Sequence, residues 1–194
     1  RYMVSIKGLS KGQADELAED PVFTETGMER SIAIAVNPEF KNLTATVGWM
    51  SKAAAENSFM NLEKGHYPEK DNEIACDTVV LDLLGLPEET GTSFTLEYET
   101  IEGKKEAQMT VCGIWKGMEH EQRTTIMVTD SFADKVIGEL SSQYAESERD
   151  SYTVRGTFAS EKKIRETLDS IVKKMGYNPD AERGEEGFII HHVN

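Results

Sequence analysis

The chain has 194 residues, of which 38% are hydrophobic, and its formal net charge is −14. This length fits one domain, or two small ones that share a core. The acidic surplus argues against a nucleic-acid partner, because phosphates require a basic face, and against docking by charge on anionic lipid. No apolar run approaches the ~20 residues that span a bilayer, and no secretory signal is visible.

The acidic surplus is uneven along the chain. Residues 51–150 hold nearly all of it, whereas residues 151–194 balance their acidic and basic groups. We therefore expect the middle of the chain to form a structural unit with its own surface. The chain begins with Arg1 rather than Met, and we interpret it as a fragment cut from a longer protein.

The first part of the chain predicts strands that alternate with helices. Ser10 and Gln13 form a capping box at the start of the first helix. Ser51 caps the second helix, which has Phe59 on its inward face. Alternating apolar residues indicate the strands. The expected elements are strands at 2–6, 31–36 and 43–49 and helices at 11–18 and 52–62.

The middle of the chain changes from a helical to an alternating period. A helix over 77–84 ends at Gly85, with Pro87 just beyond it. Two alternating segments read as a hairpin that turns at Gly103 and Lys104. The expected strands of this region are 73–76, 93–98 and 107–114.

The last part of the chain repeats the order strand, helix, strand. Asp130 or Ser131 caps a helix, and Ser160 caps the most strongly periodic helix, which ends at Gly176. Residues 141–150 are polar and predict a loop or a boundary. The expected strands are 125–129, 152–154 and 187–193. Two such β-α-β halves at the chain ends are typical of a split, ferredoxin-like sandwich, so the predicted class is α+β.

The two cysteines, Cys76 and Cys112, are too few to build a disulfide-dependent domain. The favoured interpretation is two small buried hydrophobic side chains. A single disulfide is the alternative if the domain faces an oxidising space. A metal role is least favoured, because neither cysteine has a partner at ligand spacing.

No catalytic, cofactor or metal site stands out. His191 and His192 are adjacent, so in a strand they point to opposite faces and do not readily share a metal ion. His66 and His120 are isolated, and paired carboxylates arise by chance in so acidic a chain. We therefore predict no catalytic, cofactor-binding or metal-ligating residues.

Trp115 and Met118 lie in a segment without clear periodicity. They are either loop residues folded over the core or an exposed patch that contacts a partner. We carry both residues forward as candidate partner-binding residues.

The stretch from Leu62 to Asp130 resembles a known family. The residues that carry the resemblance form turns, caps and short strands, and they are Gly65, Pro68, Glu73, Ile74, Leu84, Gly85, Gly91 and Gly113. In this order they resemble the extracytoplasmic domain of MacB/FtsX-type ABC transporter permeases. The resemblance implies a porter-like α+β subdomain, residues 1–62 and 126–194, that carries a smaller, mostly β insertion, residues 63–125.

The resemblance also implies a role. The domain would lie outside the cytoplasmic membrane, between the first two transmembrane helices of a permease that a cytoplasmic ATPase drives. It would relay motion to, or bind, an outside substrate or partner such as a peptide, a lipoprotein or a cell-envelope protein, without catalysis or cofactor. This predicts that Arg1 and Asn194 lie close together. The alternatives are a secreted or surface-displayed ligand- or peptide-binding module, and a hydrolase with an acidic active site.

Overall fold

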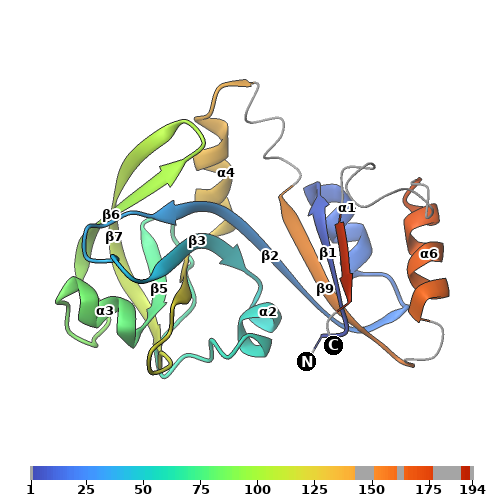
Figure 1. Ribbon diagram of the computed structural model, residues 1–194, viewed down its shortest axis with the longest axis horizontal. Coiled ribbons are helices and arrows are strands. Elements are labelled where there is room, and N and C mark those ends of the chain that lie inside the picture. Colours follow the sequence, from blue (N-terminus) through green and yellow to red (C-terminus); the bar gives the residue numbers. More distant parts are fainter. Residues whose placement is uncertain (1, 143–150, 161–163, 177–188, 193–194) are drawn as a thin grey trace. The chain divides into compact units, whose positions relative to one another are not determined.

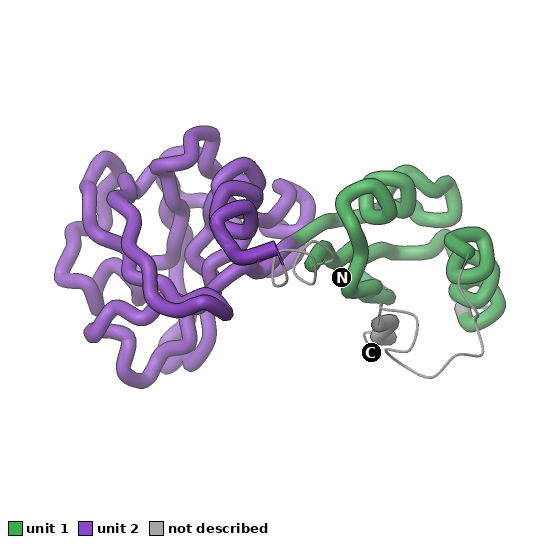
Figure 2. Tube along the Cα trace, turned by 90° about the horizontal axis from the view of Figure 1, so that it is seen from above, with its two compact units in different colours: residues 1–29, 149–194 green, residues 30–148 purple. Residues whose placement is uncertain are grey.

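The protein is an α+β chain that divides into two compact units (Figure 1). The computed structural model describes residues 2–142, 151–160, 164–176 and 189–192. The first unit comprises residues 1–29 and 149–194, and the second comprises residues 30–148 (Figure 2). The long strand β2 (Phe23–Ala35) contributes residues to both units. Among the described residues, none of the helices combines the length and the apolarity needed to cross a membrane.

The first unit contains both ends of the chain. Besides β2, its elements are β1 (Val4–Leu9), α1 (Lys11–Ala18), β9 (Tyr152–Phe158), α6 (Ile164–Lys174) and β10 (Ile189–His192). The strands lie in the order β10-β1-β9-β2, and β1 pairs antiparallel with both of its neighbours. This is the order of a split β-α-β sandwich, which confirms the predicted arrangement of the chain ends.

The outermost described residues of the first unit lie side by side. In the β1–β10 ladder, Val4 pairs with His192. Arg1 and Asn194 themselves, and the predicted strand residues 187, 188 and 193, lie outside the described residues. The pairing nevertheless brings the first and last strands of the chain together at one place.

Local sequence signals account for the start of α1. The Ser10 hydroxyl accepts a hydrogen bond from the Gln13 backbone N–H at 3.2 Å, and the Ser10 N–H donates to Gln13 Oε1 at 3.0 Å. Both halves of the predicted capping box are thus present. The helix buries Ala14 and Leu17 as its apolar stripe.

The second unit is built on a closed ring of strands. Its remaining elements are β3 (Thr44–Met50), α2 (Lys52–Asn57), β4 (Lys64–Gly65), β5 (Glu73–Asp77), α3 (Thr78–Leu84), β6 (Ser93–Thr100), β7 (Gly103–Trp115), β8 (Arg123–Met127) and α4 (Asp130–Gly138). Strands neighbour one another in the order β2-β3-β8-β5-β7, and β6 pairs with both β7 and β2. The pairing therefore closes on itself and leaves few free strand edges.

The ring encloses the main hydrophobic core. Its members are buried apolar side chains from every strand of the ring and from the inner faces of α3 and α4. The largest that are fully buried are Ile74, Leu81, Leu96, Met109, Ile114 and Ile126. Tyr98 and Phe132 add an edge-to-face ring contact, with centroids 6.1 Å apart.

The unit boundaries differ from the boundaries that we expected from the sequence. The expected division fell at 62/63 and 125/126, whereas the compact units divide at 29/30 and 148/149. The reason is strand pairing, because β3 and the second half of β2 complete the ring of residues 30–148. The excess of acidic residues that begins near residue 51 is a property of the surface and carries no information about which strands pair.

Three local predictions are corrected. Helix α2 ends at Asn57 instead of residue 62, so Phe59 lies beyond it at φ +61 and is 84% exposed instead of inward. The cap of α4 is Thr129, whose hydroxyl accepts the Phe132 N–H, and is neither Asp130 nor Ser131. The β6–β7 turn falls at residues 101–102, and Gly103 already belongs to β7. Most of the predicted 141–150 loop, and residues 161–163 after the proposed cap Ser160, lie outside the described residues.

Candidate functional site

The turn between β4 and β5 lies closely against β7, and two glycines permit this approach. A Cβ on Gly65, which has φ +74, would clash with the Cys112 carbonyl oxygen. A Cβ on Gly113 would clash with the His66 carbonyl oxygen. Glycine is thus required at both positions. Gly65 needs it for the left-handed backbone and for the close contact, and Gly113 needs it for the close contact. This approach brings the chain around His66 next to Cys112.

Three potential metal ligands meet at this contact. The donor atoms of His66, Glu73 and Cys112 all lie within 4.8 Å of one another. His66 Nε2 is 3.6 Å from Glu73 Oε2, and the Cys112 thiol donates to the His66 carbonyl oxygen at 3.3 Å. In the sequence, His66 stands isolated and Cys112 has no partner at ligand spacing. Linear spacing could not reveal the cluster, since the pairing of β4 with β7 assembles it.

Both cysteines are buried free thiols. Burial and the Glu73 carboxylate raise the pKa of Cys112 to about 12. Burial, followed by the charge of Asp77, raises the pKa of Cys76. Both side chains therefore carry their protons near neutral pH, as expected for small buried hydrophobic groups.

The remaining motif residues end elements and set turns. Gly85 is the left-handed C-cap of α3 at φ +68, directly after Leu84, as predicted. Gly91, at φ +96, donates its N–H to the Val111 carbonyl at 2.8 Å. Ile74 is fully buried in the core. Pro68 lies between β4 and β5. The residue after it, Glu69, donates its N–H to Glu73 Oε1. These roles are structural.

Trp115 and Met118 have opposite environments. Trp115 ends β7 and is 4% exposed, packed in a second cluster with Met50 and Met127. Of the two sequence alternatives, Trp115 therefore takes the one in which the side chain folds over the core. Met118 is 71% exposed. Of these two residues, Met118 is the one with the exposure that a partner contact needs.

Two neighbouring carboxylates, those of Asp77 and Glu121, lie at the start of α3. Asp77 caps α3 by accepting the Val80 N–H at 2.9 Å, and its other oxygen accepts the Thr124 hydroxyl at 2.5 Å. Glu121 lies beside Asp77, with its Oε1 buried and without a hydrogen-bond partner. Burial, and then the neighbouring Asp77, raise the pKa of Glu121 to about 7.

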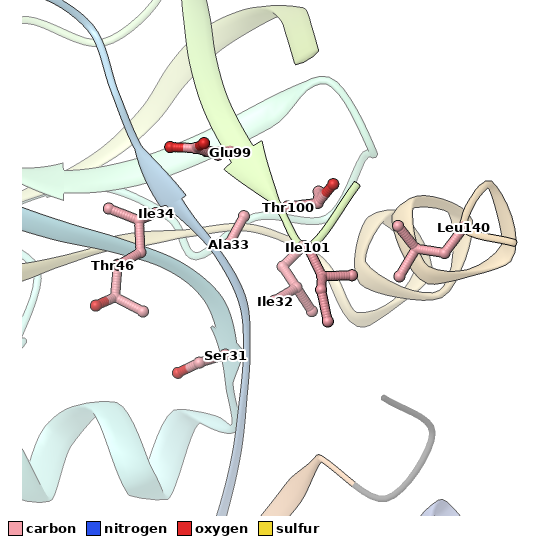
Figure 3. A pocket seen from close by; sticks show the side chains of 9 residues that line it. All are labelled: Ser31, Ile32, Ala33, Ile34, Thr46, Glu99, Thr100, Ile101 and Leu140. Atoms are coloured by element: carbon pink, nitrogen blue, oxygen red, sulfur yellow. The ribbon is translucent and has the colours of Figure 1, made fainter. Parts of the chain in front are cut away.

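A shallow hollow of about 310 Å³ opens on the second unit. Its wall is mainly apolar and includes Ile34, Ile101 and Leu140, and Glu99 lines it as well (Figure 3). Ile34 and Ile101 are 48% and 58% exposed, which is unusual for side chains of this size. Among the described residues that line the hollow, Glu99 supplies the one carboxylate, and there is no histidine or cysteine.

Solved structures share this fold over almost the whole chain. The periplasmic region of MacB from Actinobacillus actinomycetemcomitans matches with a TM-score of 0.57 at 11% sequence identity, over 98% of this chain and 88% of that one. The extracellular domain of the ABC-type transporter YknZ from Gram-positive bacteria matches with a TM-score of 0.57 at 8% identity, over 98% of this chain and 100% of that one. The sequence itself matches no protein-family model and no curated protein.

This chain therefore has the fold of the extracytoplasmic domains of ABC transporter permeases. The finding confirms the fold that the resemblance of residues 62–130 predicts. It also extends the likeness to the chain ends, which lie outside the stretch that carries the resemblance.

Proposed function

We propose that this chain is the non-catalytic extracytoplasmic domain of an ABC transporter permease. Its role is to relay ATPase-driven motion to an outside partner or to bind an outside substrate, such as a peptide, a lipoprotein or a cell-envelope protein. The observation that carries the proposal is the shared fold, which spans 98% of this chain in both comparisons. Its partners are then the transmembrane helices of the same permease and a cytoplasmic ATPase.

The pairing of the terminal strands supports this proposal. Val4 lies opposite His192, so the first and last described strands run side by side. A domain inserted between two transmembrane helices must return its chain to the place where it left. The two strands satisfy this requirement.

Exposed apolar side chains of the second unit supply candidate partner contacts. Met118 is 71% exposed and Phe59 is 84% exposed, and the hollow beside Ile101 offers a further apolar surface. Exposed apolar groups of this kind are typical of sites that bind another protein or a peptide. The hollow is also the observation that favours the alternative function, a secreted ligand- or peptide-binding module.

Labelling of intact cells tests the proposal. Met118→Cys in the full-length protein provides one exposed thiol, whereas Cys76 and Cys112 are buried and give a low background. A membrane-impermeant maleimide should label the variant in intact cells, and the label should remain with the membrane fraction. The unsubstituted protein is the control. Labelling only after lysis would contradict the proposal, and a labelled protein released into the medium would favour the secreted module.

A further inference from the structure

We propose that His66, Glu73 and Cys112 form a binding site for a divalent metal ion of the Zn²⁺ class. The three residues come from the β4–β5 turn, the start of β5 and β7, and their donor atoms lie within 4.8 Å of one another. The inference is independent of the proposed transport role. It concerns only what this cluster binds.

The imidazole of His66 is held in the tautomer that a metal ion requires. Its Nδ1 lies 2.7 Å from the Tyr67 carbonyl oxygen. Because a carbonyl only accepts hydrogen bonds, Nδ1 carries the hydrogen of the neutral ring. Nε2 then presents its lone pair to the cluster. Histidine ligands in metal sites are commonly oriented in this way, by donating their second N–H to a carbonyl or a carboxylate.

The lone pair of Nε2 faces another acceptor. Glu73 Oε2 lies 3.6 Å away, and an ionised carboxylate has no hydrogen to donate. Two acceptors at this separation repel each other unless a cation lies between them. That cation is either a proton on His66 or a metal ion, so the experiment has to distinguish the two.

The carboxylate of Glu73 is oriented by the backbone. Its Oε1 accepts the N–H groups of Glu69 at 3.1 Å and Lys70 at 2.8 Å. The side chain of Glu73 is only 14% exposed. With Oε1 occupied, Oε2 is directed toward His66 and is available as a ligand. The turn thus holds the oxygen ligand in place before any ion binds.

The third ligand is the sulfur of Cys112. In the structure its S–H donates to the His66 carbonyl oxygen. When a metal ion binds, the S–H bond breaks, the proton leaves to solvent, and the sulfur donates the electron pair to the metal. Each bound ion therefore releases one proton when His66 is neutral.

The spacing of the cluster suits tetrahedral coordination after a small closure. Bonds of about 2.3 Å to sulfur and about 2.0–2.2 Å to nitrogen and oxygen place tetrahedral ligands about 3.4–3.6 Å apart. Because all donor atoms lie within 4.8 Å of one another, no pair has to close by more than about 1 Å. The His66 side chain is 50% exposed, so a small shift of the ring that keeps Nδ1 within reach of the Tyr67 carbonyl can supply this closure. The same exposure leaves the fourth position to water.

The donor set selects the class of ion. One thiolate, one imidazole and one carboxylate suit Zn²⁺ and Co²⁺, which accept mixed sulfur, nitrogen and oxygen ligands. Ca²⁺ and Mg²⁺ require oxygen ligands and higher coordination numbers. We therefore expect no competition from millimolar Mg²⁺ or Ca²⁺.

Titration of the reduced chain with Co²⁺ tests the site. We expect one Co²⁺ per chain and a near-ultraviolet absorption band from charge transfer between thiolate and cobalt. Zn²⁺ should displace Co²⁺ and abolish the band, since Zn²⁺ binds such sites more tightly. In weakly buffered solution, Zn²⁺ binding should release about one proton per ion. A proton on His66 alone would produce neither the band nor the stoichiometric release.

Matched variants assign the ligands. Cys112→Ser should abolish the band, whereas Cys76→Ser, which changes the other buried thiol, should keep it. His66→Ala should weaken binding at least tenfold, and His120→Ala should leave it unchanged. Near-ultraviolet circular dichroism checks that each variant folds. If Cys112→Ser does not fold, the half-exposed His66→Ala variant still decides. Absence of the band in the parent chain, or unchanged affinity in His66→Ala, would overturn the proposal.

Discussion

At the scale of single residues, the contact between the β4–β5 turn and β7 depends on two glycines, which have no side chain. Gly65 and Gly113 approach carbonyl oxygens so closely that neither position has room for a methyl group. The sequence analysis assigned both glycines to a turn-forming motif. The structure shows why glycine is needed at both positions: each lies against the backbone of the neighbouring segment, in addition to any role in a turn.

Gly65→Ala should be strongly destabilising. The new Cβ would meet the Cys112 carbonyl oxygen at a residue that also has φ +74, so we expect a loss of about 2–3 kcal/mol in the free energy of unfolding. Gly91→Ala is the matched control, because Gly91 has φ +96 but open space around it, and should cost about 1 kcal/mol. Urea unfolding measures both. Equal losses would show that the contact with β7 contributes nothing.

Glu121 should make stability depend on pH. Its pKa in the folded chain is raised to about 7 from an ordinary 4.5, so the folded state binds more protons than the unfolded state between these values. Stability must therefore fall as pH rises through this window. Glu121→Gln should flatten this fall and raise the melting temperature at pH 8, because the amide is neutral and can donate to Asp77.

Thermal unfolding at pH 5, 6.5 and 8 checks the prediction for Glu121. Glu119→Gln is the control, since the Glu119 side chain is 90% exposed and should leave the pH profile unchanged. The assignment would be contradicted if the melting temperature rose from pH 5 to pH 8 by the same amount in the parent chain and in both variants.

At the scale of elements, most helices and strands follow from local signals. The capping box at Ser10, the Ser51 cap and the Gly85 terminus lie where the sequence analysis placed them. The errors concern ends and lengths. Helix α2 stops at Asn57 because Met60 folds back, with its N–H bonded to the Ala55 carbonyl, a contact that periodicity does not encode.

The attachment of α4 to β2 should depend on a buried arginine. Arg30 is 3% exposed and forms ion pairs with Asp130 at 3.0 Å and Asp134 at 2.6 Å. Removing Arg30 leaves the carboxylate of Asp130, which is 20% exposed, poorly compensated, whereas Asp134 is 58% exposed and remains solvated. We expect Arg30→Met to cost about 3 kcal/mol of unfolding free energy.

Arg155→Met is the matched control for Arg30. Arg155 pairs with Glu29 at 2.7 Å but its side chain is 33% exposed, so the expected cost is about 1 kcal/mol. Urea unfolding of both variants compares the two pairs. A loss for Arg30→Met no larger than for Arg155→Met would show that burial adds nothing to the ion pairs on α4.

At the scale of the whole molecule, the closed ring of strands decides where one unit ends. Strand β6 pairs with β7 through the hairpin and with β2 through Ile34 and Glu99. The parallel pairing of β3 with β8 joins segments that are far apart in the chain, on either side of most of the predicted insertion. Such pairings have no local signature, so the sequence suggested two units but misplaced their boundaries relative to the compact units.

The ring predicts which fragment folds alone. Residues 30–148 contain all its strands, with the second half of β2, and should unfold cooperatively when produced as an isolated fragment. Residues 63–125 lack β2, β3 and the last two residues of β8, so their hydrophobic face stays open and they should remain largely unfolded. Far-ultraviolet circular dichroism and thermal melting compare the two. Cooperative melting of the shorter fragment would favour the unit boundaries expected from the sequence, 62/63 and 125/126.

By itself, the sequence determined the α+β class, the split β-α-β arrangement of the ends, the main caps and the likeness to permease outer domains. These features depend on residues close together in the chain, where periodicity and capping are read directly. Only the tertiary structure decided the unit boundaries, the burial of Trp115 beside the exposure of Met118, and the meeting of His66 with Glu73 and Cys112. These features depend on contacts across long sequence separations. His66 and Cys112, for example, are 46 positions apart in the chain. The free energy that selects one pairing over another is shared across the whole ring and is visible in no single segment.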